Sequence, residues 1–307
     1  MKNLDEIILK ARAKINLTLD VTGKREDGYH ILEMIMQTIS LYDKVYVKKI
    51  DKPVLRLKSN LDWLPTDERN LAYMAAKLLK EKFQIKQGIF IELDKKIPVA
   101  AGLAGGSTDC AAVLIAVNRL FKLGLSKEEL MKYGLRLGAD VPYCIARGTV
   151  LAQGIGEILT PLSQQCPFCY VVLVKLPISV STAFVYKNLS LQSIQARPNT
   201  EKMIQSIEDG DLEGVCSYLC NVLETVTISH YPEIDKVKKR LLQLGAKGSL
   251  MSGSGPTVFG LFEEKETAQK AVLQLKEELK IKDVIFTTIF HTNHISNQWK
   301  RQTERGR

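Results

Sequence analysis

The sequence lacks the features of a membrane protein or a secreted protein. No apolar run reaches the roughly 18 uninterrupted residues that a membrane-spanning helix needs, and the N-terminus has no apolar signal-peptide core. The six cysteines are scattered along the chain, unlike the framework of a disulfide-rich secreted domain. We therefore expect a cytoplasmic protein that does not bind membranes.

Histidine is also scarce, and the sequence has no obvious cluster of metal ligands. His291 and His294 lie near the C-terminus and are expected to be surface residues. The segment Cys166–Cys169 has the C-x-x-C spacing of redox and zinc sites, but no histidine adjoins it. The pair Cys216 and Cys220 has helical spacing instead. We predict a plain loop before a buried strand at 166–169, and no metal site.

A positive net charge of +9 is the compositional feature that would suit a nucleic-acid partner. Part of this charge lies in residues 292–307, a polar basic tail that we expect to be mobile. The rest of the chain has no basic stripe interleaved with aromatic residues, so we expect no nucleic-acid partner. The remaining positive charge suits a phosphorylated small molecule equally well.

What the sequence does contain is a glycine-rich run, PVAAGLAGGSTD, from Pro98 to Asp109. Glycine lets backbone N–H groups converge, and a helix start adds free amide donors and roughly half a positive charge. Ser107, Thr108 and Asp109 are typical helix-start residues. The run therefore predicts a phosphate-binding loop that opens onto a helix, with a close-packed strand-to-helix turn as the alternative.

Two common phosphate loops are excluded by the same residues. The G-x-x-x-x-G-K-[ST] loop requires a lysine after its second glycine, and none follows Gly105 or Gly106. The dinucleotide fingerprint G-x-G-x-x-G fails because Ala104 stands in place of its second glycine. The local sequence thus predicts an anion site without identifying the anion.

Hydrophobic periodicity predicts the elements around this loop. Residues 7–21 alternate with a period of two, which indicates a half-buried strand with a single apolar face running from Leu9 to Val21. The loop should lead into a buried helix at 107–121, because that segment is apolar almost all round. The other predicted elements are strands at 31–47, 88–93, 170–174 and 256–262 and one ending at 288, and helices at 70–83, 126–137, 182–189, 232–244 and 264–279.

Five segments, taken together, resemble the superfamily of galactokinase, homoserine kinase, mevalonate kinase and phosphomevalonate kinase (the GHMP kinases). The glycine-rich run is similar to the ATP loop of that superfamily, residues 11–17 (ARAKINL) to its first motif and residues 250–257 (LMSGSGPT) to its third. Two further segments, DGYH at 27–30 and GADVP at 138–142, are similar to the branch whose alcohol substrate carries cytidine diphosphate. The resemblance covers most of the chain.

The resemblance implies an α+β fold of two domains with the ligands between them. Residues 1–162 would form an N-terminal GHMP kinase domain, like domain 2 of ribosomal protein S5, that carries the ATP loop and the catalytic pair. Residues 163–291 would form a ferredoxin-like C-terminal GHMP kinase domain. The polar segment 161–167, with a proline at each end, is the best boundary between them.

The resemblance also implies an activity. The chain would be an ATP-dependent kinase that phosphorylates the 2-hydroxyl of a cytidine diphosphate-linked methylerythritol, giving the 2-phosphate and ADP in the non-mevalonate (MEP) pathway of isoprenoid precursor synthesis. Mg²⁺ would arrive with ATP, and no protein ligand to the metal is predicted, because Gly106 replaces a serine of the commoner loop. The implied ATP-binding residues are Pro98, Val99, Ala100, Ala101, Gly102, Leu103, Ala104, Gly105, Gly106, Ser107 and Thr108 in the loop, Asn70 and Lys95 on the adenine side, and Asp109 in the first helical turn or on the adenine side.

Lys14 and Asp140 would be the catalytic pair. Asp140 stands before Val141 and Pro142, where local sequence alone favours a plain helix N-cap, and the resemblance makes it the general base. A neighbouring Lys14 would keep Asp140 ionised and polarise the substrate hydroxyl. The implied substrate-binding residues are Asn16 for the methylerythritol hydroxyls, Tyr29 and Tyr186 for stacking on the cytosine, the backbone of His30 for its edge, and Thr182, which shares a helical face with Tyr186.

Alternatives remain open at this point. The same fold could phosphorylate another alcohol, such as homoserine or mevalonate, although neither has a base on which tyrosines can stack. A non-catalytic RNA-binding or regulatory protein would suit the +9 charge, but not the presence of both Lys14 and Asp140. The glycine-rich segment 248–256 would close over the phosphates or be a simple hairpin turn. The small-molecule kinase is expected as a monomer or a homodimer.

Overall fold

The computed structural model describes residues 4–291 and is built around two long antiparallel strands, β1 (Glu6–Lys24) and β2 (His30–Ile50). They are the centre of a seven-stranded sheet in the order β3-β4-β2-β1-β8, with β5 and β6 beside β2. The bounds of these strands are β3 (Leu55–Ser59), β4 (Gly88–Asp94), β5 (Thr149–Gly154), β6 (Ile158–Pro161) and β8 (Cys220–Asn221).

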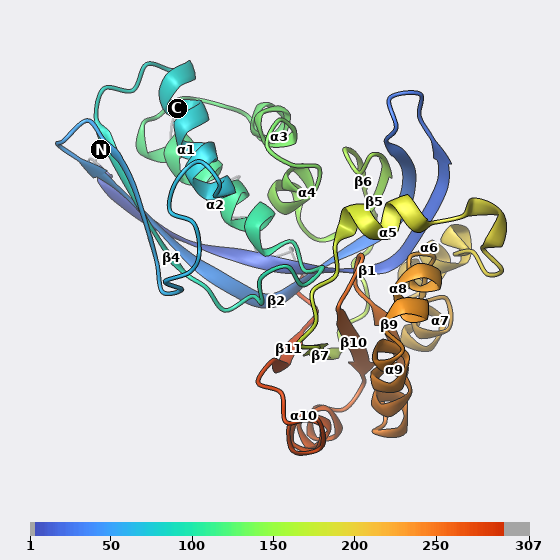
Figure 1. Ribbon diagram of the computed structural model, residues 1–307. Coiled ribbons are helices and arrows are strands. Elements are labelled where there is room, and N and C mark those ends of the chain that lie inside the picture. Colours follow the sequence, from blue (N-terminus) through green and yellow to red (C-terminus); the bar gives the residue numbers. More distant parts are fainter. Residues whose placement is uncertain (1–3, 292–307) are drawn as a thin grey trace.

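Four helices cover one face of this sheet and complete the N-terminal lobe (Figure 1). They are α1 (Leu71–Lys82), α2 (Gly105–Leu120), α3 (Lys127–Leu135) and α4 (Val141–Ala146). The central helix, α2, packs against α1, α4 and β1 and is buried continuously from Thr108 to Val117. Its sequence is apolar on nearly every side because every side meets protein.

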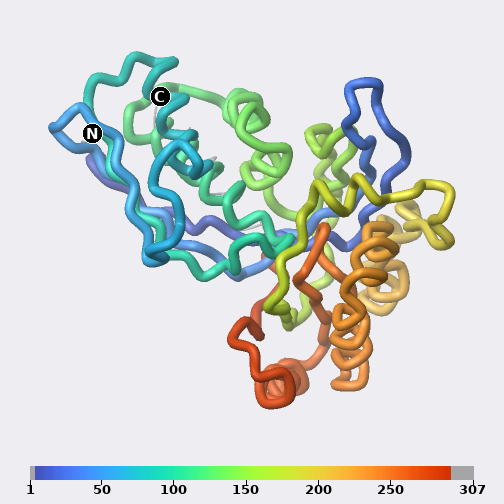
Figure 2. Tube along the Cα trace, viewed as in Figure 1, coloured from blue at the N-terminus to red at the C-terminus, as the bar shows by residue number. Residues whose placement is uncertain are grey.

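A second, antiparallel sheet forms the C-terminal lobe in the order β11-β7-β10-β9. Its strands are β7 (Tyr170–Lys175), β9 (Gly248–Met251), β10 (Thr257–Phe262) and β11 (Val284–Thr288), with α9 (Glu233–Gln243) and α10 (Lys265–Leu279) packed against them. The other elements here are α5 (Thr182–Asn188), the 3₁₀ turn η1 (Leu191–Ser193), α6 (Thr200–Glu208), α7 (Leu212–Ser217) and α8 (Glu224–His230). The trace in Figure 2 shows how the chain leaves one lobe for the other, and β8 returns to pair with β1.

The predicted strands and helices are confirmed to within a few residues. A capping box formed by Ser126 and Glu129 begins α3. The prediction did not include β3, β5, β6, β8 or the short helices α6, α7 and α8. Apart from α6, which is as long as the predicted α3, these short or edge elements carry too few residues for a period to show. The division of the chain at 162/163 stays a prediction.

β1 corrects the prediction of one apolar face. Ala11, Leu19 and Val21 belong to one cluster of the core, whereas Ala13, Ile15 and Leu17 belong to another. The register against β2 shifts between Arg12 and Lys14 and again between Asn16 and Thr18, where the apolar face changes. A bulge adds residues on one strand and so redirects the side chains that follow it. The strand is therefore buried on both sides over residues 13–21, not half-buried.

α2 begins at Gly105, two residues before the predicted start. Ala104 is its N-cap in the left-handed conformation (φ 58°), and the Thr108 N–H donates to the Ala104 carbonyl at 2.9 Å. Gly105 and Gly106 are therefore first-turn residues whose N–H groups have no partner within the helix. Asp109 lies in the second turn, so its prediction as a first-turn residue is wrong.

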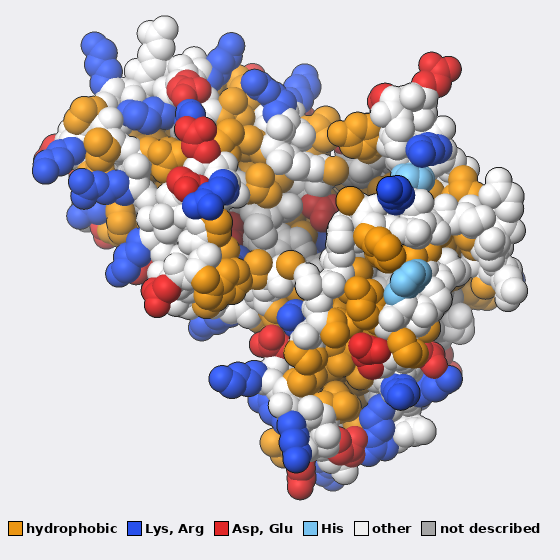
Figure 3. Space-filling view, in the orientation of Figure 1, with side chains coloured by type: hydrophobic (Ala, Val, Ile, Leu, Met, Phe, Trp, Pro, Cys, Tyr) orange, Lys and Arg blue, Asp and Glu red, His pale blue; other side chains and the backbone are white. Residues whose placement is uncertain are grey.

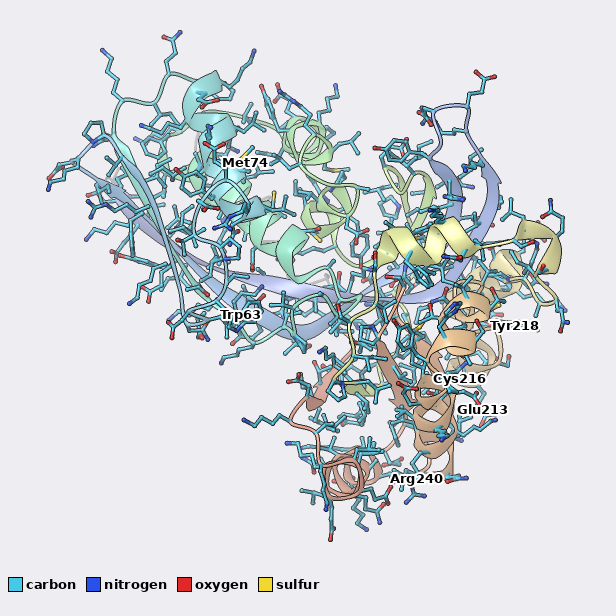
Figure 4. All side chains as sticks on the ribbon, viewed as in Figure 1. Trp63, Met74, Glu213, Cys216, Tyr218 and Arg240 are labelled. Carbon is cyan, nitrogen blue, oxygen red and sulfur yellow. The ribbon has the colours of Figure 1, made fainter. Side chains whose placement is uncertain are left out.

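The structure also bears on the predictions for the cysteines and for the histidines near the C-terminus. Cys166 and Cys169 lie in the predicted loop before β7, and both thiols are free and buried. Cys216, on α7, lies among the helices of the C-terminal lobe (Figure 4). His291 Nε2 is 2.8 Å from the Cys166 carbonyl oxygen, whereas the predictions for His294 and for the tail at 292–307 lie outside the described residues.

Within residues 4–291, no helix has the length and apolar character to cross a membrane.

Candidate active site

Lys14 on β1 and Asp140 at the start of α4 meet in the structure, although they are far apart in the sequence. The distance from Lys14 Nζ to Asp140 Oδ2 is 3.9 Å, and the two side chains are 6% and 35% exposed, respectively. The pair therefore presents the Asp140 carboxyl group to solvent with the Lys14 amino group buried behind it.

Asp140 occupies the N-cap position of α4 without capping it. Its backbone is in the αR region (φ −78°, ψ −14°), and its side chain makes no hydrogen bond to the first turn. Pro142 stands in that first turn, where the fixed φ of proline suits the helix and its missing N–H does no harm. The plain N-cap interpretation is wrong, and the carboxylate is available for other contacts.

Lys14 is held in place by its neighbours on the same strand and by the glycine-rich loop. Its Nζ donates to Asn16 Oδ1 at 2.7 Å, and Asn16 Nδ2 lies 3.3 Å from Met34 Sδ. The Lys14 backbone N–H donates to the Leu103 carbonyl at 3.2 Å. Lys14 and the loop predicted to bind ATP are thus joined by a backbone hydrogen bond.

The glycine-rich loop adopts an unusual backbone. Ala100 (φ 52°), Gly102 (φ 73°) and Ala104 (φ 58°) are all left-handed, a conformation that is strained for alanine. Backbones that mix right-handed and left-handed residues turn successive N–H groups toward a common point and make anion-binding concavities. The N-terminus of α2 follows at once and adds its own unpaired N–H groups. This arrangement is able to hold a phosphate group, and we call the loop with the N-terminus of α2 the phosphate cradle.

A second glycine-rich segment packs backbone to backbone against this loop. Residues 252–256 connect β9 to β10, which pair as antiparallel strands, so the segment is a hairpin loop. Ser252 Oγ donates to the Gly102 carbonyl at 2.9 Å. A Cβ atom placed on Gly102 would lie 2.1 Å from the Ser252 carbonyl oxygen, and one on Gly253 would lie 3.7 Å from Lys14 Nζ. The hairpin loop therefore borders both the phosphate cradle and Lys14.

Asn221 and Glu224, which the sequence analysis did not select, hold this hairpin loop from behind. Asn221 is buried, and its Nδ2 donates to the carbonyls of Met251 and Gly253, both at 2.8 Å. Glu224 Oε1 accepts the Met251 N–H at 2.9 Å. In the sequence the two are a polar pair three residues apart, which is indistinguishable from an ordinary helix start.

We expect Asn221→Ala to lower the free energy of unfolding by about 1–3 kcal/mol, because two buried carbonyls lose their donor. The KM for ATP should also rise by about tenfold, because the displaced loop borders the phosphate cradle. Thermal melts and steady-state kinetics check both. Asn118→Ala is the matched control, since Asn118 also bridges a loop, donating to the Leu125 carbonyl and accepting its N–H. It should lose stability with an unchanged KM, and an unchanged KM in Asn221→Ala would exclude the positioning role.

The aromatic residues predicted to bind cytosine gather at the other end of the site. The rings of His30 and Tyr186 stack with centroids 5.1 Å apart, and Tyr29 is exposed beside them. Burial, with a smaller contribution from nearby Lys24, lowers the pKa of His30, so its ring is neutral at neutral pH. Thr182 Oγ1 lies 2.8 Å from Ser254 Oγ, which links α5 to the hairpin loop.

These residues line one cleft of about 720 Å³, and Figure 3 shows the surface hollowed between the N-terminal lobe and the segment that carries α5. The predicted site residues that line it are Lys14, Asn16, Tyr29, His30, Gly102, Ala104, Ser107, Asp140, Thr182 and Tyr186. Lys24 and Lys187 also line it, and no sequence signal distinguishes them from other surface lysines. The cleft thus has one end with Lys14 and Asp140 and another end with aromatic rings, and lysines line both ends.

Four predicted ATP-binding side chains make other contacts. Asn70 caps α1, accepting the Ala72 N–H and donating to the Pro65 carbonyl. Thr108 Oγ1 donates to the Arg12 carbonyl at 2.8 Å. Lys95 and Asp109 are buried against each other, with 2.5 Å between Nζ and Oδ2. None of the four lines the cleft, and their contact with ATP stays a prediction.

Comparisons with known proteins agree with this geometry. The family "GHMP kinases N terminal domain" matches residues 70–148, and "GHMP kinases C terminal" matches residues 203–281. The chain is 52% identical to the 4-diphosphocytidyl-2-C-methyl-D-erythritol kinase of Lachnoclostridium phytofermentans, over 95% of this chain and all of that one. It is 51% identical to the enzyme of the same name from Alkaliphilus oremlandii, over 87% and 92% of the two chains.

A solved structure gives the same result. The crystal structure of a 4-(cytidine 5'-diphospho)-2C-methyl-D-erythritol kinase superimposes with a TM-score of 0.79 at 32% identity, over 93% of this chain and all of that one. The homoserine kinase of Cytophaga hutchinsonii superimposes with a TM-score of 0.74 at 23% identity, over 94% and 95% of the two chains. At that identity the second likeness concerns the fold alone.

Proposed function

The chain belongs to the 4-diphosphocytidyl-2-C-methyl-D-erythritol kinases, a branch of the GHMP kinases, and from this premise we propose how its cleft works. It is an ATP-dependent kinase of the MEP pathway, a phosphotransferase that acts on an alcohol. The predicted family, two-domain α+β fold and activity are confirmed. The homoserine, mevalonate and RNA-binding alternatives are therefore set aside.

The proposed mechanism rests on one observation, the 3.9 Å approach of Lys14 Nζ to Asp140 Oδ2 beside the phosphate cradle. The 2-hydroxyl oxygen of the substrate attacks the γ-phosphorus of ATP, and the bond from that phosphorus to the β-phosphate oxygen breaks to release ADP. Asp140 accepts the hydroxyl proton as the general base. Lys14 keeps Asp140 ionised before the transfer and offsets the negative charge of the transferring group.

We propose that the loop Pro98–Thr108 holds the ATP phosphates with its N–H groups, and that Mg²⁺ enters bound to ATP. Among residues 4–291, no group of three or more His, Cys, Asp or Glu is placed to hold a metal ion. This donor set fits an ion carried by nucleotide phosphates and water, which is how Mg²⁺ commonly binds at such sites. The ion would neutralise phosphate charge, and the Ser107 hydroxyl is one of the oxygen groups lining the cleft that could approach it.

The aromatic end of the cleft would select the cytidine group. We propose that cytosine stacks on Tyr186 and Tyr29 and that the backbone of His30 reads its edge, while Asn16 binds the methylerythritol hydroxyls. Lys24 and Lys187 line the same end of the cleft and suit the diphosphate between the two halves of the substrate. Mevalonate and homoserine offer neither a base nor a diphosphate to these groups.

Tyr186→Ala should raise the KM for the cytidylated substrate by roughly 10- to 100-fold, because stacking on an aromatic ring stabilises a bound base by about 1–3 kcal/mol. The KM for ATP should stay within about twofold, since ATP occupies the other end of the cleft. Tyr186→Phe is the matched control and should retain wild-type values, because it keeps the ring. An equal rise in the KM for both substrates, or no rise in either, would contradict the placement of cytosine on Tyr186.

The function itself is tested by ADP release with ATP and Mg²⁺ in the presence of 4-diphosphocytidyl-2-C-methyl-D-erythritol, homoserine or mevalonate. Turnover is expected with the cytidylated alcohol alone. Turnover with either control alone would keep the fold and reject the substrate, whereas no turnover with any of them would favour a non-catalytic role. A cytoplasmic location and a monomeric or homodimeric state remain part of the proposal.

A further inference from the structure

Beneath the phosphate cradle, and outside the cleft, three charged side chains are buried together. Lys95, Asp43 and Asp109 are 8%, 0% and 2% exposed, respectively. Lys95 Nζ contacts Asp43 Oδ2 and lies 2.5 Å from Asp109 Oδ2. The same nitrogen lies 3.5 Å from the carbonyl oxygen of Gly105, the first residue of α2. We call these three residues the buried cluster; it joins β2, the loop after β4, and α2.

The formal charges of the buried cluster do not balance. One ammonium group faces two carboxyl groups, so the cluster would carry a net charge of −1 if all three were ionised. Burial of an uncompensated charge is strongly unfavourable, and a carboxyl group in that position keeps its proton instead. One of the two aspartates is therefore a neutral acid.

The hydrogen bonds show which aspartate keeps the proton. Asp43 Oδ1 accepts the N–H groups of Lys96 at 2.5 Å and Ile97 at 2.8 Å and its Oδ2 contacts Lys95, so both of its oxygens have donors. Asp109 Oδ1 is buried and has no hydrogen-bond partner within residues 4–291. Burial above all, and then the nearby Asp43, raises the pKa of Asp109 to about 8 despite the opposing effect of Lys95.

The elements packed around Asp109 do not supply a compensating charge. The buried side of α1 consists of alanine and leucine. Arg12 on β1 directs its guanidinium onto the Phe290 ring, 3.6 Å from its centre. The thiols of Cys110 on α2 and Cys144 on α4 stay neutral, because burial raises the pKa of each. The charge of the buried cluster is therefore set by its own three members.

We propose that Asp109 is a positioning residue for ATP, which works as a neutral acid and keeps a second negative charge from forming under the phosphate cradle. The proposal rests on the proposed function of that cradle. With Asp109 neutral, Lys95 and Asp43 balance, and the N-terminus of α2 keeps its positive character for the phosphates. Ionised Asp109 adds a negative charge within one and a half turns of that N-terminus and opposes ATP.

The test compares the KM for ATP of the wild type and Asp109→Asn between about pH 6.5 and about pH 9.5. Asparagine has nearly the shape of the protonated acid and does not ionise. Below about pH 7 the two values should agree within about twofold, and above about pH 8.5 the wild-type value should rise by about tenfold relative to the variant. Parallel profiles would overturn the proposal, because the ionisations of ATP and of Asp140 affect both proteins alike.

A second measurement needs no turnover, so it decides the matter even if the proposed kinase activity is absent. The folded pKa of Asp109 lies above its unfolded value of about 3.9, so between about pH 4 and about pH 8 only the unfolded chain releases this proton. This group therefore lowers wild-type stability as the pH rises. The melting temperature of Asp109→Asn relative to wild type should increase over that range, and a constant difference would count against a neutral Asp109.

Asp43→Asn provides an independent variant should Asp109→Asn fail to fold. It keeps an oxygen to accept the N–H groups of Lys96 and Ile97 and leaves Asp109 as the single counter-ion of Lys95. Asp109 should then be ionised throughout, and the alkaline rise in the KM for ATP should disappear. A rise that persists in Asp43→Asn would overturn the proposal.

Discussion

Asp140→Asn is expected to lower kcat by about 10²- to 10⁴-fold and to leave the KM for ATP close to its wild-type value. The amide keeps the size of the side chain and does not accept a proton from the substrate hydroxyl. Fold and α4 should be retained, because the Asp140 side chain makes no capping hydrogen bond. Single-turnover kinetics with saturating ATP would separate the chemical step from binding.

Asp211→Asn is the matched control for this variant. Asp211 likewise occupies the N-cap position of a short helix, α7, with no side-chain cap, and it lies in the C-terminal lobe away from the cleft. It should retain wild-type kcat and stability. Near-normal turnover in Asp140→Asn, with ATP bound normally, would remove Asp140 from the role of general base.

Gly102→Ala should reduce kcat/KM for ATP by about 100-fold, because the two glycine-rich loops can no longer meet. The new Cβ would lie 2.1 Å from the Ser252 carbonyl oxygen, which is a backbone atom that does not rotate away. Residue 102 also has a positive φ of 73°, which alone disfavours alanine by about 1–2 kcal/mol. Steady-state kinetics and thermal melts on the same preparation measure the two effects.

Gly124→Ala separates backbone strain from the clash. Gly124 has nearly the same φ, 72°, but a Cβ there meets nothing within 4 Å. Gly124→Ala should lose about as much stability as the positive φ alone costs at residue 102. Its kcat/KM for ATP should stay at the wild-type value. If Gly102→Ala matched Gly124→Ala in kcat/KM, contact between the two loops would not matter for catalysis.

Local sequence predicts the parts of the site but not how they meet. The run from Pro98 to Asp109 contains enough glycine beside a helix start to indicate an anion site. Nothing local, however, brings Lys14 to Asp140, because only the fold joins β1 to α4. That expectation came from the resemblance to the GHMP kinases. Secondary structure was predictable for the same reason as the loop, since periodicity is a local property.

Local sequence does not reveal which side chains a residue is buried against. Lys95 and Asp109 have the chemistry of ATP contacts, which stay a prediction, and the structure adds that the two are buried against each other and that Lys95 also contacts Asp43 of β2. Asn221 has no distinctive neighbours in sequence, and its importance comes from two carbonyls thirty residues or so further along the chain. Contacts of this kind depend on the tertiary structure, and neither the hydrophobic period nor the spacing of residues in the sequence reveals them.

The register shifts between β1 and β2 at residues 12–18 of β1 bear on how such enzymes can be recombined. Because they redirect the strand, Ala13, Ile15 and Leu17 pack in one cluster with Leu173 and Phe259 of the C-terminal sheet. A chimera that joined the N-terminal lobe of this chain to the C-terminal lobe of a relative would therefore change the packing of a shared hydrophobic core, not only a linker. The two lobes would therefore have to be exchanged together. A C-terminal lobe from a relative would have to pack closely against the apolar side chains of β1 for the chimera to fold.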